Sequence, residues 1–219
     1  MLRFYNVEKK VTQEDQRYIS FLLKDTPVTR ADAMSYEQQL AFLHAAQVSI
    51  LSHSTTGIPI PYNQAREPKN LFLLNSGICY DRSRVLEKIF MNAGFTTRHV
   101  ALYAQDPGAS ALEKIPLLEV ASHATTEVLT KRGWLVVDSN NPWLAVDGQR
   151  QPYSLASMNA VFEQNRQIRW QHPPAAGYEI FYSRPSTFIY GLYSRHGRFY
   201  PPYTPGIPDY NLRELLYNF

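Results

Sequence analysis

The segment Asn75-Ser76-Gly77-Ile78-Cys79-Tyr80-Asp81 contains the only cysteine of the chain and leads into a strongly patterned helix. The apolar residues that follow recur at helical spacing, which predicts a helix with one buried face. Gly94 is suited to end this helix, because glycine readily adopts the left-handed conformation. Cys79 therefore falls in the first turn, where free N–H groups and the helix dipole favour an anion such as a thiolate.

Two further helices are predicted before this segment. Thr12 is followed by acidic residues, which is typical of a helix start because such side chains suit the positive end of the helix. Ser35 and Gln38 form a capping-box pattern, and the apolar residues after them predict a helix over residues 36–52. Prolines within residues 55–62 end this pattern, so we expect a loop or a short extended segment there.

Strands are predicted after the central helix. Residues 95–103 are rich in β-branched and aromatic side chains, and two similar runs, 120–130 and 134–138, flank Lys131-Arg132-Gly133 in a hairpin pattern. Residues 105–116 contain Asp-Pro-Gly and small side chains, so we expect a loop there.

The last part of the chain, residues 150–219, is rich in proline and tyrosine. We expect a helix over residues 154–166, one or two strands over residues 178–193, and an extended surface segment over residues 198–210. No linker of low complexity and no internal repeat separates this part from the rest. We therefore interpret it as an extension of the main core rather than a second domain.

Composition narrows the classes of protein. Hydrophobic residues make up 44% and charged residues 19% of the chain, so a sizeable core is expected. The net charge of +3 is small and scattered, which argues against a nucleic-acid partner. One cysteine excludes an internal disulfide framework and a cysteine-based zinc cluster, and we expect no metal and no cofactor. The start of the chain has no signal-peptide pattern and no run is long enough for a membrane span, so a cytoplasmic protein is expected.

A cysteine nucleophile needs a base, and that base needs a group that orients it. Among the histidines after Cys79, His123 begins a predicted strand, and Asp138 ends the next one. A carboxylate at the end of an apolar strand needs a partner, because burying it alone is costly. The Nδ1–H of His123 is one such partner; a turn with Ser139 and Asn140, which Asp138 would cap, is the other.

The turn between the two strands decides whether His123 and Asp138 can meet. A two-residue turn at Lys131-Arg132 would pair Thr130 with Gly133 and leave the two side chains diagonal to each other on one face, within reach. A three-residue turn would put them on opposite faces unless a bulge intervened. The triad hypothesis therefore requires the two-residue turn, with both side chains on the face that meets the cysteine-bearing helix.

Three sequence blocks resemble the transglutaminase-like superfamily, a papain-related group of cysteine acyl-transfer enzymes. The matching residues are Gly77, Cys79 and Asp81 with Gly94, Phe95, Arg98 and Val100, then His123-Ala124-Thr125-Thr126-Glu127-Val128, then Gly133-Trp134 through Asp138. The resemblance covers about residues 72–142.

Two departures from the family pattern stand out. Thr125 occupies a position where the family often has an aromatic residue, and Ser139-Asn140 replace a common Pro-Thr. Neither departure removes a catalytic group, and both bear on substrate preference more than on chemistry. Arg98 and Glu127 are interpreted as structural residues that form ion pairs or hydrogen bonds.

The resemblance implies a catalytic triad of Cys79, His123 and Asp138 that acts on an amide of a peptide or a glutamine side chain, through a thioester. The expected partner is a peptide or protein amide substrate, and water or an amine would complete the reaction. The Cys79 N–H and a second donor would bind the oxyanion. The candidates for the second donor are Asn75, Gln64 and Asn63.

Two alternatives remain open. The first is an acyl carrier like the arylamine N-acetyltransferases, although the Arg-Gly-Gly-x-Cys start of that family is absent here. The second is a non-catalytic binding module on the same fold, which the complete set of three triad residues disfavours.

These observations predict an α+β protein with a papain/transglutaminase-like core, in which the cysteine-bearing helix packs on an antiparallel sheet. We expect residues 1–219 to form a single domain. Its core would span about residues 72–142, after a helical N-terminal part, 1–71, and before the C-terminal extension, 150–219.

Overall fold

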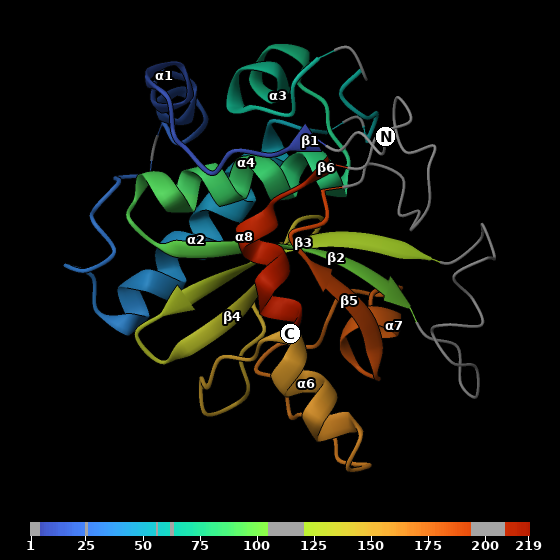
Figure 1. Ribbon diagram of the computed structural model, residues 1–219. Helices are drawn as coiled ribbons and strands as arrows, with labels where there is room; N and C mark the ends of the chain where they lie inside the picture. Colours follow the sequence, from blue (N-terminus) through green and yellow to red (C-terminus); the bar gives the residue numbers. More distant parts are fainter. Residues whose placement is uncertain (1–4, 25, 56, 62–63, 105–120, 194–208) are drawn as a thin grey trace.

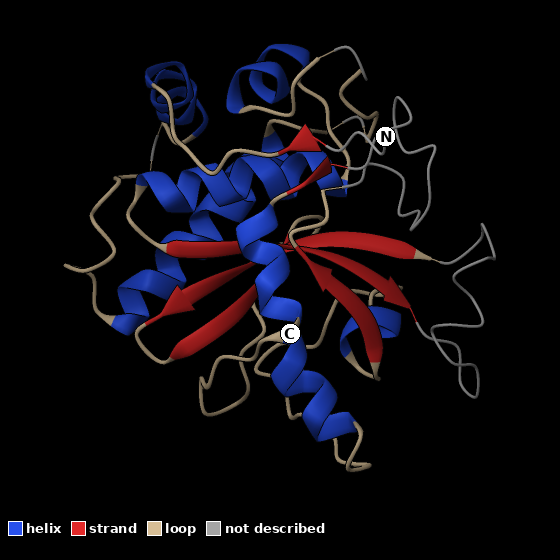
Figure 2. Cartoon of the chain, viewed as in Figure 1, coloured by secondary structure: helices blue, strands red, loops and turns tan. Residues whose placement is uncertain are grey.

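The computed structural model combines helices with an antiparallel sheet, as expected for an α+β protein (Figures 1 and 2). It describes residues 5–24, 26–55, 57–61, 64–104, 121–193 and 209–219. The described helices are α1 (Gln13–Leu22), α2 (Tyr36–Ser52), α3 (Pro68–Leu74), α4 (Cys79–Asn92), α6 (Leu155–Phe162), α7 (Glu179–Tyr182), α8 (Leu212–Leu215) and the 3-10 helix η1 (Leu216–Asn218). The described strands are β1 (Tyr5–Asn6), β2 (Thr96–Ala104), β3 (Ser122–Thr130), β4 (Gly133–Asp138), β5 (Ser186–Tyr190) and β6 (Asp209–Tyr210).

The central sheet has the strand order β4-β3-β2-β5, and each pair of neighbours is antiparallel. Strand β5 belongs to the part of the chain that the sequence pattern placed in an extension, yet it forms an edge of this sheet beside β2. A second, short sheet pairs β1 with β6 in parallel and joins the two ends of the chain (Figure 1).

Helices cover both faces of the central sheet. The Thr126 hydroxyl of β3 donates to the Ser83 carbonyl of α4 at 3.0 Å. Its neighbour Glu127 instead accepts the backbone N–H of Leu155, at the start of α6, at 2.8 Å. Because successive strand side chains point to opposite faces, α4 and α6 lie on opposite sides of the sheet. In Figure 1, α1 and α3 lie beyond α4, on its side away from the sheet.

Both predicted helix starts in the N-terminal part are confirmed. Thr12 caps α1 by accepting the Asp15 N–H at 3.1 Å, and Ser35 caps α2 by accepting the Gln38 N–H at 3.2 Å. The sequence pattern did not separate the short helix α3. It begins at Pro68, where the missing N–H of proline costs no helical hydrogen bond.

The C-terminal part departs from the predicted elements. Residues 178–193 were expected to supply one or two strands; they supply one, β5, and their first part forms the helix α7, which was not predicted. Helix α6 ends at Phe162, one turn earlier than predicted. The predicted loop over residues 105–116 and most of the extended segment over residues 198–210 lie outside the described residues. None of the helices in the described ranges has both the length and the apolar character that crossing a membrane requires.

Arg98 and Glu127 form the structural ion pair predicted from the sequence. The Arg98 Nε donates to Glu127 Oε2 at 2.8 Å, and both side chains are buried. The guanidinium also lies over the rings of Trp134 and Tyr190, at 4.1 and 4.0 Å from the ring centres. This pair therefore joins β2 and β3 and holds aromatic residues of β4 and β5 against them.

A second buried cluster of charges ties the chain ends to α4. The Tyr193 hydroxyl lies 2.9 Å from a Glu87 oxygen and 2.8 Å from a Glu214 oxygen, but its one proton can be donated to only one carboxylate. The Lys9 ammonium contacts both carboxylates. Burial and the charge of Glu87 outweigh Lys9 and raise the pKa of Glu214 to about 7.

Glu214 makes a pH-dependent contribution to stability. Its pKa is higher in the folded protein than the ordinary value of 4.5, so the folded state binds an extra proton between these values. Glu214 by itself should therefore lower the free energy of unfolding by on the order of 3 kcal/mol between about pH 4.5 and 7. His99 in the same cluster acts in the opposite direction below about pH 6.5, because burial lowers its pKa to about 3. Urea unfolding at pH 5 and 8 therefore compares the wild type with Glu214→Gln, whose stability relative to the wild type should rise with pH, and uses the exposed Glu163→Gln as control. The same pH dependence in Glu214→Gln and the wild type would contradict it.

Candidate active site

Cys79 is the first residue of α4, as the sequence pattern predicted. The Asp81 carboxylate fixes this helix start by accepting the N–H groups of Ile78 at 3.0 Å and Ile60 at 3.1 Å. The chain enters the helix tightly, since a Cβ on Gly77 would lie 3.3 Å from the Asp81 Cβ. The Cys79 thiol is partly exposed at this position, with the N–H groups of the first turn around it.

The predicted register of the hairpin is confirmed. Thr130 pairs with Gly133 and Thr125 pairs with Asp138, so the connection is the two-residue turn. His123 and Asp138 consequently share a face, and His123 Nε2 lies 2.8 Å from Asp138 Oδ2. Both side chains are buried, which places this contact away from bulk water.

The imidazole nitrogen that meets Asp138 is Nε2, and the expectation of Nδ1 was wrong. The two residues are diagonal neighbours, so the nitrogen farther from the His123 backbone is the one that spans the gap. This orientation turns Nδ1 away from Asp138, and the Cys79 side chain lies close enough to the imidazole to help raise its pKa. The imidazole thus lies between the thiol and the carboxylate.

The face on which His123 and Asp138 lie also differs from the expected one. Helix α4 packs on the opposite face, where Thr126 meets Ser83. Cys79 still reaches His123, because each lies at an end of its element: Cys79 begins α4 and His123 is the second residue of β3. The site therefore lies where the helix start and the strand end come together, and not between the helix and the middle of the sheet.

Asp138 serves in both of the roles that the sequence left open. Its Oδ2 contacts His123 and accepts the Tyr182 hydroxyl at 2.6 Å. Its Oδ1 accepts the backbone N–H groups of Asn140 and Asn141, each at 2.7 Å, and so caps the turn after β4. The Asn141 side-chain amide adds a further bond to Oδ1 at 3.2 Å, so five donors hold the carboxylate in one orientation, which in turn fixes the His123 ring.

These contacts set the charges of the site. Burial disfavours the imidazolium, but the Asp138 carboxylate and the Cys79 thiol outweigh burial and raise the pKa of His123 to about 10. Burial likewise opposes the Asp138 carboxylate, yet its contacts with His123 and Tyr182 keep its pKa below the ordinary value. At neutral pH His123 is therefore a cation that lies beside the Cys79 side chain.

An aromatic wall encloses His123. The rings of Tyr178, Phe181 and Tyr182 lie 5.2, 5.5 and 6.2 Å from the imidazole, measured between ring centres. They come from α7 and the residue before it, in the part predicted as strands. The sequence reasoning missed these residues, although their spacing of three and four positions is the signal of one helix face.

A chain of polar side chains lies beside the wall. The buried Arg82 of α4 donates to Ser54 Oγ at 2.8 Å, to the Ser54 carbonyl at 2.6 Å and to Asn140 Oδ1 at 2.7 Å. The Asn140 amide then donates to the Tyr178 oxygen at 2.7 Å. Arg82 follows Cys79 by three positions, so both side chains lie on the same side of the helix. This relation was also missed in the sequence.

The three predicted oxyanion donors have different outcomes. Asn75 ends α3 in a left-handed conformation, and its side chain is exposed. Gln64 is half-buried in a turn, where its backbone N–H donates to the Pro61 carbonyl at 2.9 Å. Asn63 lies outside the described residues. The polar side chains next to the thiol are instead Arg82 and its partners.

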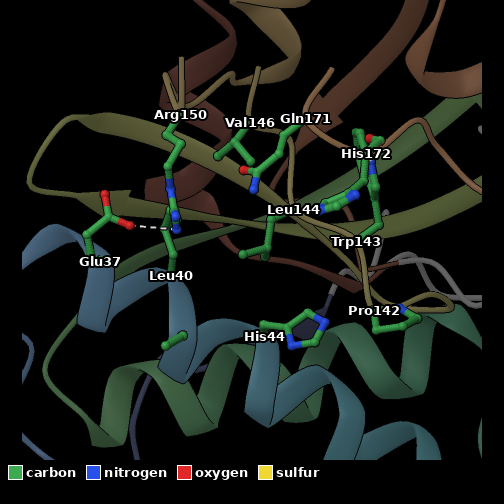
Figure 3. Close-up of a pocket in the computed structure, with 11 residues that line it drawn as sticks. Glu37, Leu40, His44, Pro142, Trp143, Leu144, Val146, Arg150, Gln171 and His172 are labelled. Carbon is green, nitrogen blue, oxygen red and sulfur yellow. Dashed lines mark hydrogen bonds and ion pairs between the residues drawn. The ribbon is translucent and has the colours of Figure 1, made fainter. Parts of the chain in front are cut away.

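Figure 3 shows a pocket of about 320 Å³ between α2 and the segment after β4. Trp143, His44 and His172 line it, and an ion pair between Glu37 and Arg150, 2.6 Å long, lies at its rim. Its lining residues are distinct from the proposed triad. Trp143 links it to the site, since its ring stacks on Tyr182 with 4.7 Å between ring centres.

The described part of the chain brings no three His, Cys, Asp or Glu side chains together in an arrangement that could hold a metal ion. The groups near Cys79 are a thiol, an imidazole, a carboxylate, a guanidinium and phenols. They are suited to nucleophilic attack and proton transfer by side chains alone.

Comparisons with known proteins identify no family and no activity for this chain. No protein-family model matches the sequence, and no curated protein matches it. Among solved structures, the chain is similar to an arylamine N-acetyltransferase from Bacillus cereus, described as having a unique Cys-His-Glu catalytic triad. The match covers 58% of this chain and 49% of that one, with 14% identity and a TM-score of 0.34. The chain thus matches about half of that protein's length, and a likeness this low assigns no activity to it.

Proposed function

We propose that this chain is a cysteine enzyme that transfers or hydrolyses an acyl group held as an amide, through a thioester on Cys79. The observation that carries the proposal is the line of contacts from the Cys79 thiol through His123 to Asp138. The three sequence blocks that resemble the transglutaminase-like superfamily support the same chemistry. We take residues 1–219 as one functional domain, because β5 and α7 of the C-terminal part complete the sheet and the site.

In the first step of the proposed reaction, the Cys79 thiolate attacks the carbonyl carbon of the amide. A carbon–sulfur bond forms, and the carbonyl π electrons move to the oxygen. When this tetrahedral intermediate collapses, the carbon–nitrogen bond breaks and the His123 imidazolium gives its proton to the leaving amine. The product is a thioester on Cys79, a free amine and a neutral imidazole. Asp138 holds the ring in place throughout and stabilises its charged form.

In the second step, a nucleophile attacks the thioester. The neutral His123 takes a proton from water or from a primary amine as that molecule adds to the carbonyl carbon. The carbon–sulfur bond then breaks, which regenerates the Cys79 thiolate and the imidazolium. Water gives a peptidase, amidase or deamidase, and an amine gives a transglutaminase. The amide of a peptide bond or of a glutamine side chain is the substrate that the sequence blocks favour.

The proposal predicts an acyl-enzyme on the single cysteine. Incubation with 4-nitrophenyl acetate should add one acetyl group to the wild-type protein, detected as a shift in its intact mass, and should leave Cys79→Ala unmodified. A peptide library with and without a primary amine then identifies the reaction by mass spectrometry: cleaved peptides, deamidated glutamine or an amine adduct. A wild-type protein that carries no acyl group on Cys79 would overturn the proposed function and favour a binding module.

A further inference from the structure

We propose that the Tyr178 hydroxyl is the second oxyanion donor, and that Arg82 and Asn140 prepare it for this role. The inference rests on the proposed acyl-transfer function and identifies a catalytic group for it. The Cys79 N–H, at the start of α4, would be the first donor. Of the three side chains that the sequence suggested for the second, Asn75 is exposed.

The contacts of Asn140 decide whether the Tyr178 hydroxyl donates or accepts. A guanidinium has only donors, so the Asn140 atom that meets Arg82 must be the amide oxygen. The amide nitrogen then faces Tyr178 and donates to its oxygen. Tyr178 is therefore the acceptor in this bond, and its own proton remains to be donated. Among the residues that the structure describes, none accepts that proton.

The charge of Arg82 acts on the Tyr178 hydroxyl through Asn140. Arg82 is a buried cation, and its three bonds within the described residues go to neutral acceptors on Ser54 and Asn140. Its charge therefore polarises the Asn140 amide, which in turn draws electron density from the Tyr178 oxygen. Burial and the Asp138 charge raise the pKa of Tyr178 above its ordinary value, while the hydrogen bond from Asn140 and the charge of Arg82 act in the opposite direction. The chain from Arg82 to Tyr178 thus counters part of the effect of burial on this O–H group.

Two contacts fix the position of the Tyr178 side chain. Its ring meets the His123 imidazole edge-on, with 5.2 Å between ring centres, and His123 lies close enough to Cys79 for Cys79 to help raise its pKa. On the other side, Asn140 links the hydroxyl to Arg82, which shares a helix side with Cys79. The hydroxyl is thus held near the thiol from two directions. Tyr178 is half-buried, so its hydroxyl can face a substrate that approaches the partly exposed Cys79.

The substitution Tyr178→Phe tests this role, because it keeps the ring that packs on His123 and removes only the hydroxyl. Acylation of Cys79 by 4-nitrophenyl acetate, followed by release of 4-nitrophenolate, should slow by about 100- to 1000-fold, the usual loss for one oxyanion donor. Alkylation by iodoacetamide should keep its wild-type rate and pH profile, because this reaction forms no oxyanion. Tyr153→Phe, outside the site, serves as the control with both rates unchanged.

A second pair of variants tests whether the Asn140 side chain supports the Tyr178 hydroxyl as an oxyanion donor. Asn140→Ala keeps the backbone bond to Asp138 but removes the side chain that contacts Tyr178. Its acylation rate should fall while its alkylation rate does not. Adding Asn140→Ala to Tyr178→Phe should cause no further loss, because both changes interrupt one chain of hydrogen bonds. Additive losses would contradict the link between the two residues.

The outcomes separate this inference from the function on which it rests. If the wild-type protein is acylated and Tyr178→Phe is acylated at the same rate, the inference alone is overturned. The same holds if Tyr178→Phe loses alkylation and acylation to an equal degree, since that result reports a disturbed thiol. If the wild-type protein itself is not acylated, the proposed function fails and the oxyanion role fails with it.

Discussion

Replacing His123 with alanine should slow the alkylation of Cys79 by iodoacetamide roughly 100-fold at pH 6, and this difference should vanish near pH 10. His123 stays protonated up to about pH 10, so in the wild-type protein a positive charge lies beside Cys79 at acidic and neutral pH. A thiol without this neighbour ionises only near the ordinary value of about 8.5. Acyl transfer, which also needs the imidazole as acid and base, should fall by on the order of 10⁴-fold.

Alkylation rates between pH 5 and 10, measured by mass spectrometry, check this expectation. His172→Ala is the matched control, because this histidine is exposed and lies in the separate pocket. Circular dichroism of both variants establishes that the fold is kept. Equal alkylation rates of the wild type and His123→Ala at pH 6 would show that the thiol is not activated by His123, and the catalytic proposal would then fail.

The largest loss of stability is expected for Arg98→Met. This substitution leaves the buried Glu127 carboxylate without its cation and removes the guanidinium from between the rings of Trp134 and Tyr190. Breaking a buried ion pair from one side costs about 3–5 kcal/mol, because the remaining charge has lost its partner. The free energy of unfolding in urea should fall by about this amount.

The double variant Arg98→Met/Glu127→Gln identifies the cause. A neutral amide at position 127 needs no cation, so the double variant should recover part of the stability that Arg98→Met loses. Arg166→Met, at an exposed position, should leave the free energy of unfolding nearly unchanged. If the double variant is no more stable than Arg98→Met, the loss comes from packing on the aromatic rings and not from the unpaired carboxylate.

Local signals in the sequence predicted much of the framework. Thr12 and Ser35 start helices where the capping patterns place them, since the hydrogen bonds involved span only three residues. Cys79 begins its helix for a similar reason, because Asp81 binds the N–H group just before it. The Lys131-Arg132 turn fixed the hairpin register, which brought His123 and Asp138 to one face.

Segments that depend on distant packing were predicted less well. Residues 178–193 were expected to supply one or two strands, but residues 179–182 fold as a short helix that places aromatic rings around His123. A helix of four residues gains little from its own hydrogen bonds, so its stability comes from packing against the sheet, where it contacts β2 and β5. The partner of β5 could not be predicted either, because strand pairing over long separations leaves no local pattern.

The sequence alone thus determined the elements and the order of the candidate residues, because helix caps, apolar spacing and turn length act between near neighbours. Only the tertiary structure decided that Nε2 of His123 meets Asp138, and that both lie on the sheet face opposite α4. It also decided that Asn140 and Tyr178 continue a hydrogen-bond chain from Arg82 to the side of Cys79. These relations depend on how a helix start, a strand end and a C-terminal helix pack together, and such packing follows from the whole core rather than from any one segment.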